Sequence, residues 1–272
     1  MILVAGGDSF IFGNELADQT TGPSLSTFPA LLAGQSSMDY KCVAWPGNAN
    51  NAITRMVLNE CEQSLNQGQK VAVMIMWTFI NRYEFKFTFD TKQALSPWYS
   101  INSWNVEDHE KILSKLLNAD DKMVSHHLAN RRTAEATGIS AFAQNYFKYV
   151  GYNEYHALYL TLKEILLLQN YLNIKNIPYV FATAENSFYQ HSTYERIKDD
   201  YMANIYNQID WNSWYFFPEG KNSNETQAPR GFYQWALENK YKVGATHPLE
   251  DAHIDAAELI KEKFNELVKK HY

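Results

Sequence analysis

The chain has 272 residues, of which 46% are hydrophobic and 20% are charged, and its formal net charge is −6. The length predicts one large domain with a full hydrophobic core, and no apolar run reaches the roughly 20 residues that a membrane span needs. The acidic balance argues against a nucleic-acid-binding protein, because such a protein needs a basic face.

The first residues carry no visible targeting signal, because no basic segment precedes the short apolar run at residues 2–5. We therefore expect a cytoplasmic protein. The two cysteines, Cys42 and Cys61, lie in different predicted elements and form no CxxC pattern. We expect both to be buried thiols, and we predict no metal and no other cofactor.

Four short apolar runs predict strands that are buried in a parallel sheet. In chain order they cover residues 2–5, 40–45, 70–77 and 178–182. Apolar residues at helical spacing predict helices over residues 50–67, 155–175 and 251–270. Strands that alternate with helices are typical of βαβ units, so the sequence predicts an α/β fold.

Residues 83–154 depart from this alternation. They begin with YEFKFTFD, in which aromatic and polar residues alternate at the period of a half-buried strand. A loop rich in tryptophan and tyrosine (SPWYSINSW) follows, and then two predicted helices at about residues 107–118 and 120–136. We interpret the segment as an insertion after the third strand, which forms a lid over the strand ends within a single domain spanning residues 1–272.

The ends of the predicted strands carry most of the polar residues that a functional site would use. In a parallel α/β sheet, ligands bind outside the carboxyl ends of the strands. The residues at these ends are Asp8 and Ser9 after the first strand, Gly47 and Asn48 after the second, Thr78 to Arg82 after the third, and Thr183 to Asn186 after the fourth.

The glycine-containing turn GGDSFIFGN after the first strand fits neither common nucleotide-binding motif. A P-loop requires a lysine where Asn14 stands, and the glycines at positions 6, 7 and 13 do not form GxGxxG. A serine nucleophile remains, and it requires a base. His247 precedes the last predicted helix, which places it near the same sheet edge as Ser9.

An oxyanion formed at this edge would need hydrogen-bond donors. Gly47 permits a close backbone approach, and the neighbouring Asn48 and Asn50 carry side-chain amides.

Three blocks together resemble the SGNH, or GDSL-type, hydrolases: GGDSF after the first strand, PGNAN after the second, and His-Pro before the terminal helix. The resemblance covers residues 1–82 and 155–270 and leaves the insertion unmatched. It implies a three-layer α/β/α fold with a flavodoxin-like parallel sheet. It also implies a serine esterase that requires no metal or organic cofactor.

The resemblance also implies roles for single residues. Ser9 matches the nucleophile, and its own backbone N–H is one oxyanion donor. Gly47 matches the glycine that supplies a second donor, and His247 matches the general base. Asp8 matches the aspartate of the motif and is expected to shape the turn.

The sequence departs from the family pattern after the third strand. The family carries GxND there, and its asparagine, which completes the oxyanion hole, corresponds to Phe79. The alternatives for this donor are Asn81, Thr78 and Asn48. Arg82 is expected either to bind a substrate carboxylate or to anchor the insertion by a salt bridge, and the Trp-Thr and Arg pattern here resembles that of bacterial and phage-encoded relatives.

A second departure concerns the acid that orients the histidine. It belongs three residues before His247, where Gly244 stands. One alternative is a dyad in which a backbone carbonyl holds the imidazole. Another is the pair of Glu250 and His253, which has the family spacing, although His253 is expected to be a packing or capping residue of the terminal helix.

The remaining conspicuous residues have simpler interpretations. His126 and His127 point about 100° apart on a predicted helix, so they are expected to lie on a solvated face rather than to bind a metal. Four tryptophans are candidates for stacking on sugar rings or, more simply, for packing the lid on the sheet: Trp98, Trp104, Trp211 and Trp214.

These observations predict a serine hydrolase that cleaves an ester, such as an O-acetyl group on a carbohydrate. One alternative is a binding or structural protein with a weakened site, and another is an acyltransferase that uses the same residues. The expected partner is a small-molecule or glycan ester, with neither nucleic acid nor membrane. A phage-encoded member of the family would be expected to associate with the virion, and the sequence predicts no oligomeric state.

Overall fold

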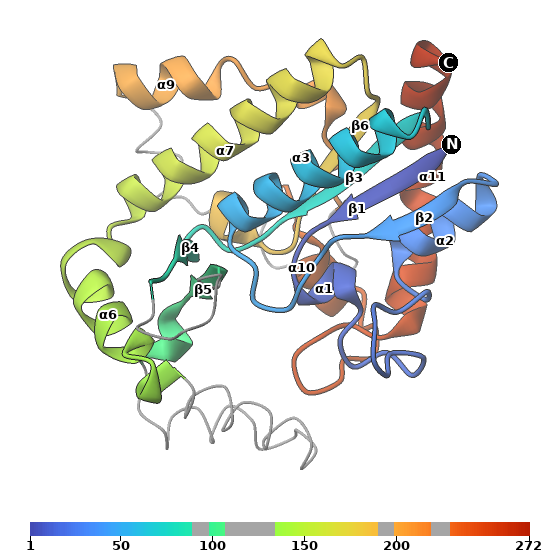
Figure 1. Cartoon of the computed structure of the whole chain (residues 1–272). Coiled ribbons are helices and arrows are strands. Elements are labelled where there is room, and N and C mark those ends of the chain that lie inside the picture. Colours follow the sequence, from blue (N-terminus) through green and yellow to red (C-terminus); the bar gives the residue numbers. More distant parts are fainter. Residues whose placement is uncertain (89–97, 107–133, 190–198, 219–228) are drawn as a thin grey trace.

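The computed structural model describes residues 1–88, 98–106, 134–189, 199–218 and 229–272 (Figure 1). Its centre is a four-stranded parallel sheet with the order β2 (Asp39–Cys42), β1 (Ile2–Gly6), β3 (Val71–Trp77) and β6 (Tyr179–Thr183). All three strand pairings are parallel. The predicted α/β fold with a parallel sheet is therefore confirmed.

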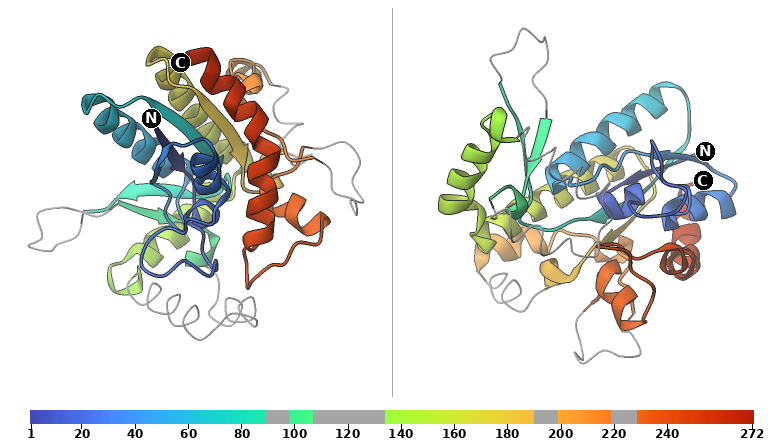
Figure 2. Two further views of the ribbon diagram at one scale, coloured as in Figure 1. Left: turned by 90° about the vertical axis from the view of Figure 1, so that its right-hand side faces the viewer. Right: turned by 90° about the horizontal axis from the view of Figure 1, so that it is seen from below.

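Helices cover both faces of the sheet (Figure 2). The α-helices are α1 (Ser9–Phe12), α2 (Phe28–Gln35), α3 (Asn50–Asn66), α6 (Ile139–Tyr146), α7 (Glu154–Ile174), α9 (Asp200–Tyr206), α10 (Phe232–Glu238) and α11 (Glu250–His271). Shorter turns are the π-helical η2 (Phe147–Gly151) and the 3₁₀ helices η1 (Ser103–Asn105), η3 (Asn186–Tyr189) and η4 (Trp211–Ser213). The helices predicted over 50–67, 155–175 and 251–270 are confirmed within one residue.

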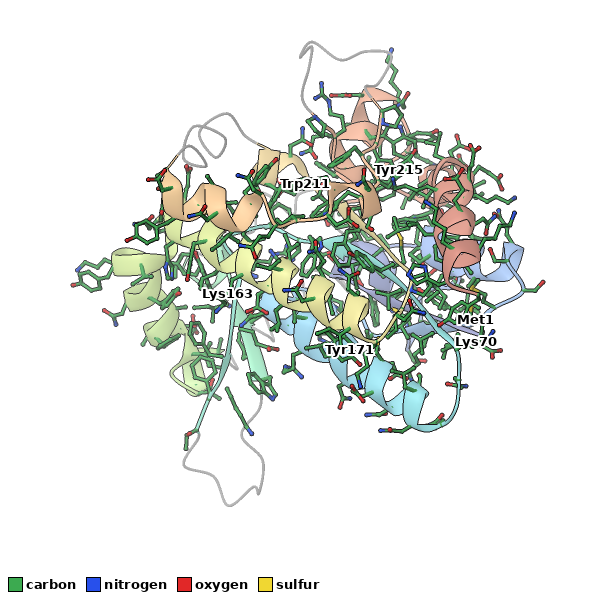
Figure 3. All side chains as sticks on the ribbon, turned by 90° about the horizontal axis from the view of Figure 1, so that it is seen from above. Met1, Lys70, Lys163, Tyr171, Trp211 and Tyr215 are labelled. Carbon is green, nitrogen blue, oxygen red and sulfur yellow. The ribbon has the colours of Figure 1, made fainter. Side chains whose placement is uncertain are left out.

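The two faces of the sheet are built from alternate residues of the same strands. In β1, Ile2 and Val4 belong to the core beneath α3 and α7, whereas Leu3 and Ala5 belong to the core beneath α2 and α11. Every residue of β1, β3 and β6 is buried, because helices cover both faces. Figure 3 shows Tyr171 of α7, whose hydroxyl donates to Glu62 of α3 at 3.0 Å and links the two helices of one layer.

The edge strand β2 is shorter than the predicted strand over residues 40–45. It ends at Cys42, although the N–H of Val43 still donates to the carbonyl of Ala5 at 2.9 Å. The chain then turns through Trp45, Pro46 and Gly47 toward the carboxyl end of β1. The sequence missed this boundary because the apolar run continues into the turn.

The first part of the predicted insertion is a hairpin. Strand β4 (Tyr83–Lys86) pairs antiparallel with β5 (Trp98–Ile101), so the predicted strand exists but is shorter than YEFKFTFD. Figure 1 places this hairpin and α6 beyond the carboxyl ends of the central strands. The helices predicted at 107–118 and 120–136 fall almost entirely outside the described residues, and the lid remains a prediction.

Among the residues that the structure describes, no helix combines the length and the hydropathy that crossing a membrane requires.

Candidate active site

Ser9 stands at the point where β1 turns into α1. The carboxylate of Asp8 caps this short helix by accepting the N–H of Phe10 at 3.1 Å. The turn is tight, because a Cβ atom on Gly7 would lie 2.5 Å from the side chain of Ile11. The carboxyl end of the strand therefore presents Ser9 at the edge of the sheet where ligands bind in α/β folds.

His247 meets Ser9 from the other end of the chain. Its Nε2 lies 2.8 Å from Ser9 Oγ, across 238 positions of sequence. The imidazole is positioned by the loop before α11, where the N–H of Gly244 donates to the carbonyl of His247 at 2.9 Å, and by the ring of Phe10, which packs edge-on against it. This is the contact that a serine nucleophile and its general base require.

Glu15 holds the opposite side of the imidazole. Its Oε1 lies 2.5 Å from His247 Nδ1, and it also accepts the backbone N–H of Thr246 at 3.1 Å and the Thr246 hydroxyl at 2.7 Å. With the ring proton on Nδ1, facing this carboxylate, Nε2 is left to accept the proton of Ser9.

The protonation state of Glu15 suits this role. Burial acts to raise its pKa, but the hydrogen bond and the charge of His247, together with the two hydrogen bonds from Thr246, lower the pKa below its ordinary value. The side chain is therefore an ionised acceptor near neutral pH.

Gly244 explains why the acid can come from so far away in sequence. The family pattern that the sequence resembles has the acid at this position, but here a Cβ atom would overlap Oε2 of Glu15. The glycine thus leaves the space that the Glu15 carboxylate occupies. Glu15 also has a φ of 72°, a left-handed conformation that sequence patterns do not predict for glutamate.

The structure contains neither of the two alternatives, which were a backbone carbonyl that orients His247 and a separate pair of Glu250 and His253. The imidazole is held by Glu15 rather than by a backbone carbonyl. Glu250 accepts the N–H of Ala17 at 2.7 Å, and His253 Nδ1 accepts the N–H of Phe28 at 3.2 Å, so Glu250 and His253 do not form the predicted pair.

The Gly47 turn lies against the Ser9 turn. Gly47 has a φ of 81°, which a glycine adopts without strain. The Asn48 amide donates to the carbonyl of Gly7 at 3.0 Å and also contacts the sulfur of Met56 at 3.6 Å. Asn48 thus ties the turn after β2 to the turn after β1, and its amide hydrogens already have partners.

Asp8 is the buried centre of a second network. It has no exposed surface, and its Oδ2 accepts the Thr78 hydroxyl at 2.6 Å and Arg82 Nη1 at 2.8 Å. One prediction was that Arg82 anchors the insertion by a salt bridge. In the structure Arg82 pairs instead with Asp8, the residue before the serine. The hydroxyl hydrogen of Thr78 is committed to Asp8.

The two other asparagines near this edge differ in position. Asn50 Oδ1 accepts the N–H of Thr78 at 2.9 Å, and its Nδ2 donates to the Thr78 carbonyl and to Thr161, so it braces the loop after β3. For Asn81, no hydrogen bond to Ser9 or to His247 is present within the described part of the chain.

The tryptophans fall into different environments. Trp214 is buried and stacks with Phe188, and Trp211 packs on Trp214 with ring centroids 5.0 Å apart, so both belong to the core beside β6. Trp98 is exposed, with the guanidinium of Arg55 over its ring. The Trp104 side chain and the pair His126 and His127 lie outside what the structure describes.

A scan against protein-family models and a search of curated proteins found no match. Among solved structures, the chain is similar to a protein from Desulfitobacterium hafniense assigned to the G-D-S-L lipolytic family, with 12% identity and a TM-score of 0.38 over 96% of this chain and 98% of that one. It is also similar to a carbohydrate esterase family 2 enzyme with a carbohydrate-binding domain from Corynascus thermopiles, with 10% identity and a TM-score of 0.46. An acetyl xylan esterase from Butyrivibrio proteoclasticus has 12% identity and a TM-score of 0.46. The similarity covers 98% of this chain in both latter cases, and 66% and 64% of those chains.

Proposed function

We propose that this protein is a serine hydrolase that cleaves an ester through an acyl-enzyme on Ser9. The observation that carries the proposal is the continuous hydrogen-bonded series from Ser9 Oγ to His247 Nε2, at 2.8 Å, and from His247 Nδ1 to Glu15, at 2.5 Å. A nucleophile, a base and an acid in this order are what acyl transfer requires, whatever fold carries them.

In the proposed reaction, His247 Nε2 takes the proton of Ser9 as Oγ attacks the ester carbonyl carbon. The carbonyl electron pair moves onto its oxygen, where the N–H groups of Ser9 and Gly47 act as hydrogen-bond donors. The tetrahedral intermediate collapses, and the leaving alcohol takes the proton from His247. Water then attacks the acyl-enzyme with His247 again as base, which releases the carboxylic acid and regenerates Ser9.

Glu15 is proposed as the group that orients His247 and balances the imidazolium charge during both attacks. It supplies the acid whose absence at Gly244 motivated the alternative of a weakened, non-catalytic site. An acyltransferase would use the same residues, with an alcohol in place of water as the acceptor.

We further propose that the ester is an O-acyl group on a carbohydrate. The support is a groove of about 390 Å³ beside the Gly47 turn, whose lining includes Phe12, Trp45 and Asn59. Trp45 is 60% exposed, and its ring packs edge-on against Phe12. A fixed and exposed indole next to polar side chains suits the apolar face and hydroxyl groups of a sugar ring.

The test of the nucleophile is mass spectrometry after treatment with a fluorophosphonate. We expect one adduct per chain on Ser9, no adduct in Ser9→Ala and slow labelling in His247→Ala, because the hydroxyl then lacks its base. The matched control is Ser64→Ala in α3, which removes a serine remote from the site and should label as the wild type does.

Turnover should follow labelling. We expect hydrolysis of p-nitrophenyl acetate, and a lower KM for acetylated xylo-oligosaccharides than for that small ester. No labelling of the wild type together with no turnover of short acyl esters would refute the hydrolase. Product partitioning to an added acceptor sugar, in place of free acid, would instead identify the acyltransferase.

A further inference from the structure

Arg82 is a partly buried cation in contact with Asp8, the residue before the candidate nucleophile, and it takes no part in the hydrogen-bonded series of Ser9, His247 and Glu15. Its side chain is 16% exposed. Nη1 donates to Asp8 at 2.8 Å and to Thr78 Oγ1 at 3.0 Å, and it lies 3.5 Å from the carbonyl oxygen of Asn48. Within the described residues, these hydrogen bonds all engage Nη1, so the donors on Nε and Nη2 have no protein partner there.

The contacts of Arg82 place it between the two turns that matter for an oxyanion. Asp8 immediately precedes Ser9, and Asn48 immediately follows Gly47. The guanidinium therefore bridges the segments whose backbone N–H groups are the proposed donors. It is also held from one side by the ring of Phe79, with 4.4 Å between Cζ and the ring centroid.

Three other polar side chains near this edge already donate their hydrogens to protein acceptors. The Asn48 amide donates to the Gly7 carbonyl and to the Met56 sulfur. The Asn50 amide donates to the Thr78 carbonyl and to the Thr161 hydroxyl, and the Thr78 hydroxyl donates to Asp8. None of these groups can give a hydrogen bond to a substrate without losing one of these contacts.

A second carboxylate, Glu185, faces the same cation. It follows β6, is 7% exposed and accepts the N–H of Ser187 at 2.7 Å. Its side chain interacts electrostatically with Arg82 and with Asp8. The guanidinium is thus held by the Asp8 carboxylate after β1 and lies in the field of a second carboxylate after β6, so little reorganisation would be needed for it to act on developing charge.

We propose that Arg82 is a catalytic residue of this site: a guanidinium N–H on Nε or Nη2 supplies the third oxyanion-hole donor, in place of the asparagine absent at Phe79. This inference rests on the proposed hydrolase function. Arginine keeps its proton at every accessible pH, so it donates a hydrogen bond and does not act as a general acid. As the Ser9 Oγ to carbon bond forms, the carbonyl electron pair moves onto oxygen opposite Arg82, and it returns to the carbonyl when the alcohol leaves.

The test compares Arg82→Lys and Arg82→Gln with wild type on p-nitrophenyl acetate. Loss of one oxyanion donor typically lowers kcat by about 10²- to 10³-fold, and we expect a loss of this size with KM changed by less than about 3-fold. A trifluoromethyl ketone, whose adduct with serine carries a true oxyanion, should lose affinity by a similar factor. A residue that only supports the fold would not produce this split.

Removal of Arg82 alone leaves the buried Asp8 carboxylate without its cation, which can prevent folding. The double variant Asp8→Asn/Arg82→Gln avoids the unpaired charge and should show the same split between kcat and KM. The matched control is Lys175→Gln, because Lys175 likewise pairs with a carboxylate, that of Glu62 at 2.7 Å, but lies at the C-terminal end of α7, away from the Ser9 turn and from the groove. It should keep wild-type kcat.

Folded Arg82 variants with wild-type kcat and wild-type ketone affinity would overturn the inference. An increase in KM that is confined to negatively charged esters, with kcat unchanged, would also overturn it. That result would identify Arg82 as a binder of a substrate carboxylate. A wild-type protein that takes no fluorophosphonate adduct would refute the hydrolase itself, which is a different result from an active wild type with active Arg82 variants.

Discussion

At the scale of single residues, the site depends on one acid in an uncommon backbone conformation. A left-handed φ costs a residue other than glycine roughly 1–2 kcal/mol, and Glu15 has a φ of 72°. Its carboxylate gains hydrogen bonds from both the main chain and the side chain of Thr246 and from His247. Charge-assisted hydrogen bonds of this kind offset the strain, and they place the acid where the imidazole needs it.

Substitution of Glu15 tests this arrangement directly. Glu15→Gln keeps the size of the side chain but offers His247 a neutral amide, which favours the wrong tautomer of the imidazole. We expect kcat for p-nitrophenyl acetate to fall by about 10²- to 10⁴-fold. Gly244→Ala should produce part of the same loss, because its Cβ would displace Oε2 of Glu15.

The matched control for Glu15 is Glu250→Gln, whose carboxylate accepts the N–H of Ala17 and makes no contact with His247. It should retain wild-type kcat. Equal activity of Glu15→Gln and wild type would show that His247 works without this acid.

At the scale of elements, helix α11 is tied to the start of α2, its neighbour on the same face of the sheet. His253 of α11 accepts the N–H of Phe28, the first residue of α2, and stacks on the Phe28 ring. Burial, and then the charge of His247, lower the pKa of His253 from 6.5 to about 3. The imidazole is therefore the neutral acceptor that caps one helix from another.

This junction predicts a pH dependence of stability. Between about pH 6.5 and pH 3, the unfolded chain binds a proton at His253 that the folded chain does not bind, so the free energy of unfolding falls as pH falls through this window. Above pH 6.5 His253 causes no loss of stability. Inside the window the free energy of unfolding falls by up to about 1.4 kcal/mol for each pH unit. Glu15, whose folded pKa is lowered, acts in the same direction at lower pH.

The variant His253→Asn separates the titration of His253 from that of Glu15, because the Asn carbonyl can still accept the N–H of Phe28 but does not titrate. Urea unfolding at pH 7.5, 6 and 5 should show a less stable protein at pH 7.5 with a flatter dependence on pH than wild type. Parallel dependences in the two proteins would contradict the assignment.

At the scale of the whole molecule, the described part of residues 83–154 shares its core with the sheet. Phe147 of η2 is 1% exposed and packs on Tyr83 of β4. Both belong to the hydrophobic cluster that includes Val73 of β3 and Leu162 of α7. Because one core joins these elements, we expect the chain to unfold as one cooperative unit, in line with the predicted single domain.

Truncation of this contact should destabilise the whole protein. Phe147→Ala removes a buried ring, which typically costs about 3–5 kcal/mol, so the thermal midpoint should fall in a single transition. Phe142→Ala is the matched control, because Phe142 on the adjacent helix α6 is 38% exposed and should cost much less. Two separate transitions in differential scanning calorimetry would instead indicate that residues 83–154 fold independently.

Local patterns in the sequence were enough to predict the central sheet and the long helices. Short apolar runs and helical spacing depend on near neighbours in the chain, so the predicted bounds of α3, α7 and α11 match within one residue. Parallel strands run in one direction, so their carboxyl ends lie at the same edge of the sheet, which is why Ser9 and His247 were expected there. Their side chains lie 2.8 Å apart in the structure.

Only the tertiary structure decided which partners those residues have. Glu15 meets His247 because a left-handed backbone turns it into the space that Gly244 leaves, and neither feature follows from residue spacing. The pairing of Arg82 with Asp8 likewise depends on contacts between distant turns rather than on a local pattern. Sequence by itself determined the central strands, the three long helices and the sheet edge at which chemistry is expected, because these follow from local periodicity and strand direction. The identity of the acid and the position of the guanidinium follow from packing between segments far apart in the chain.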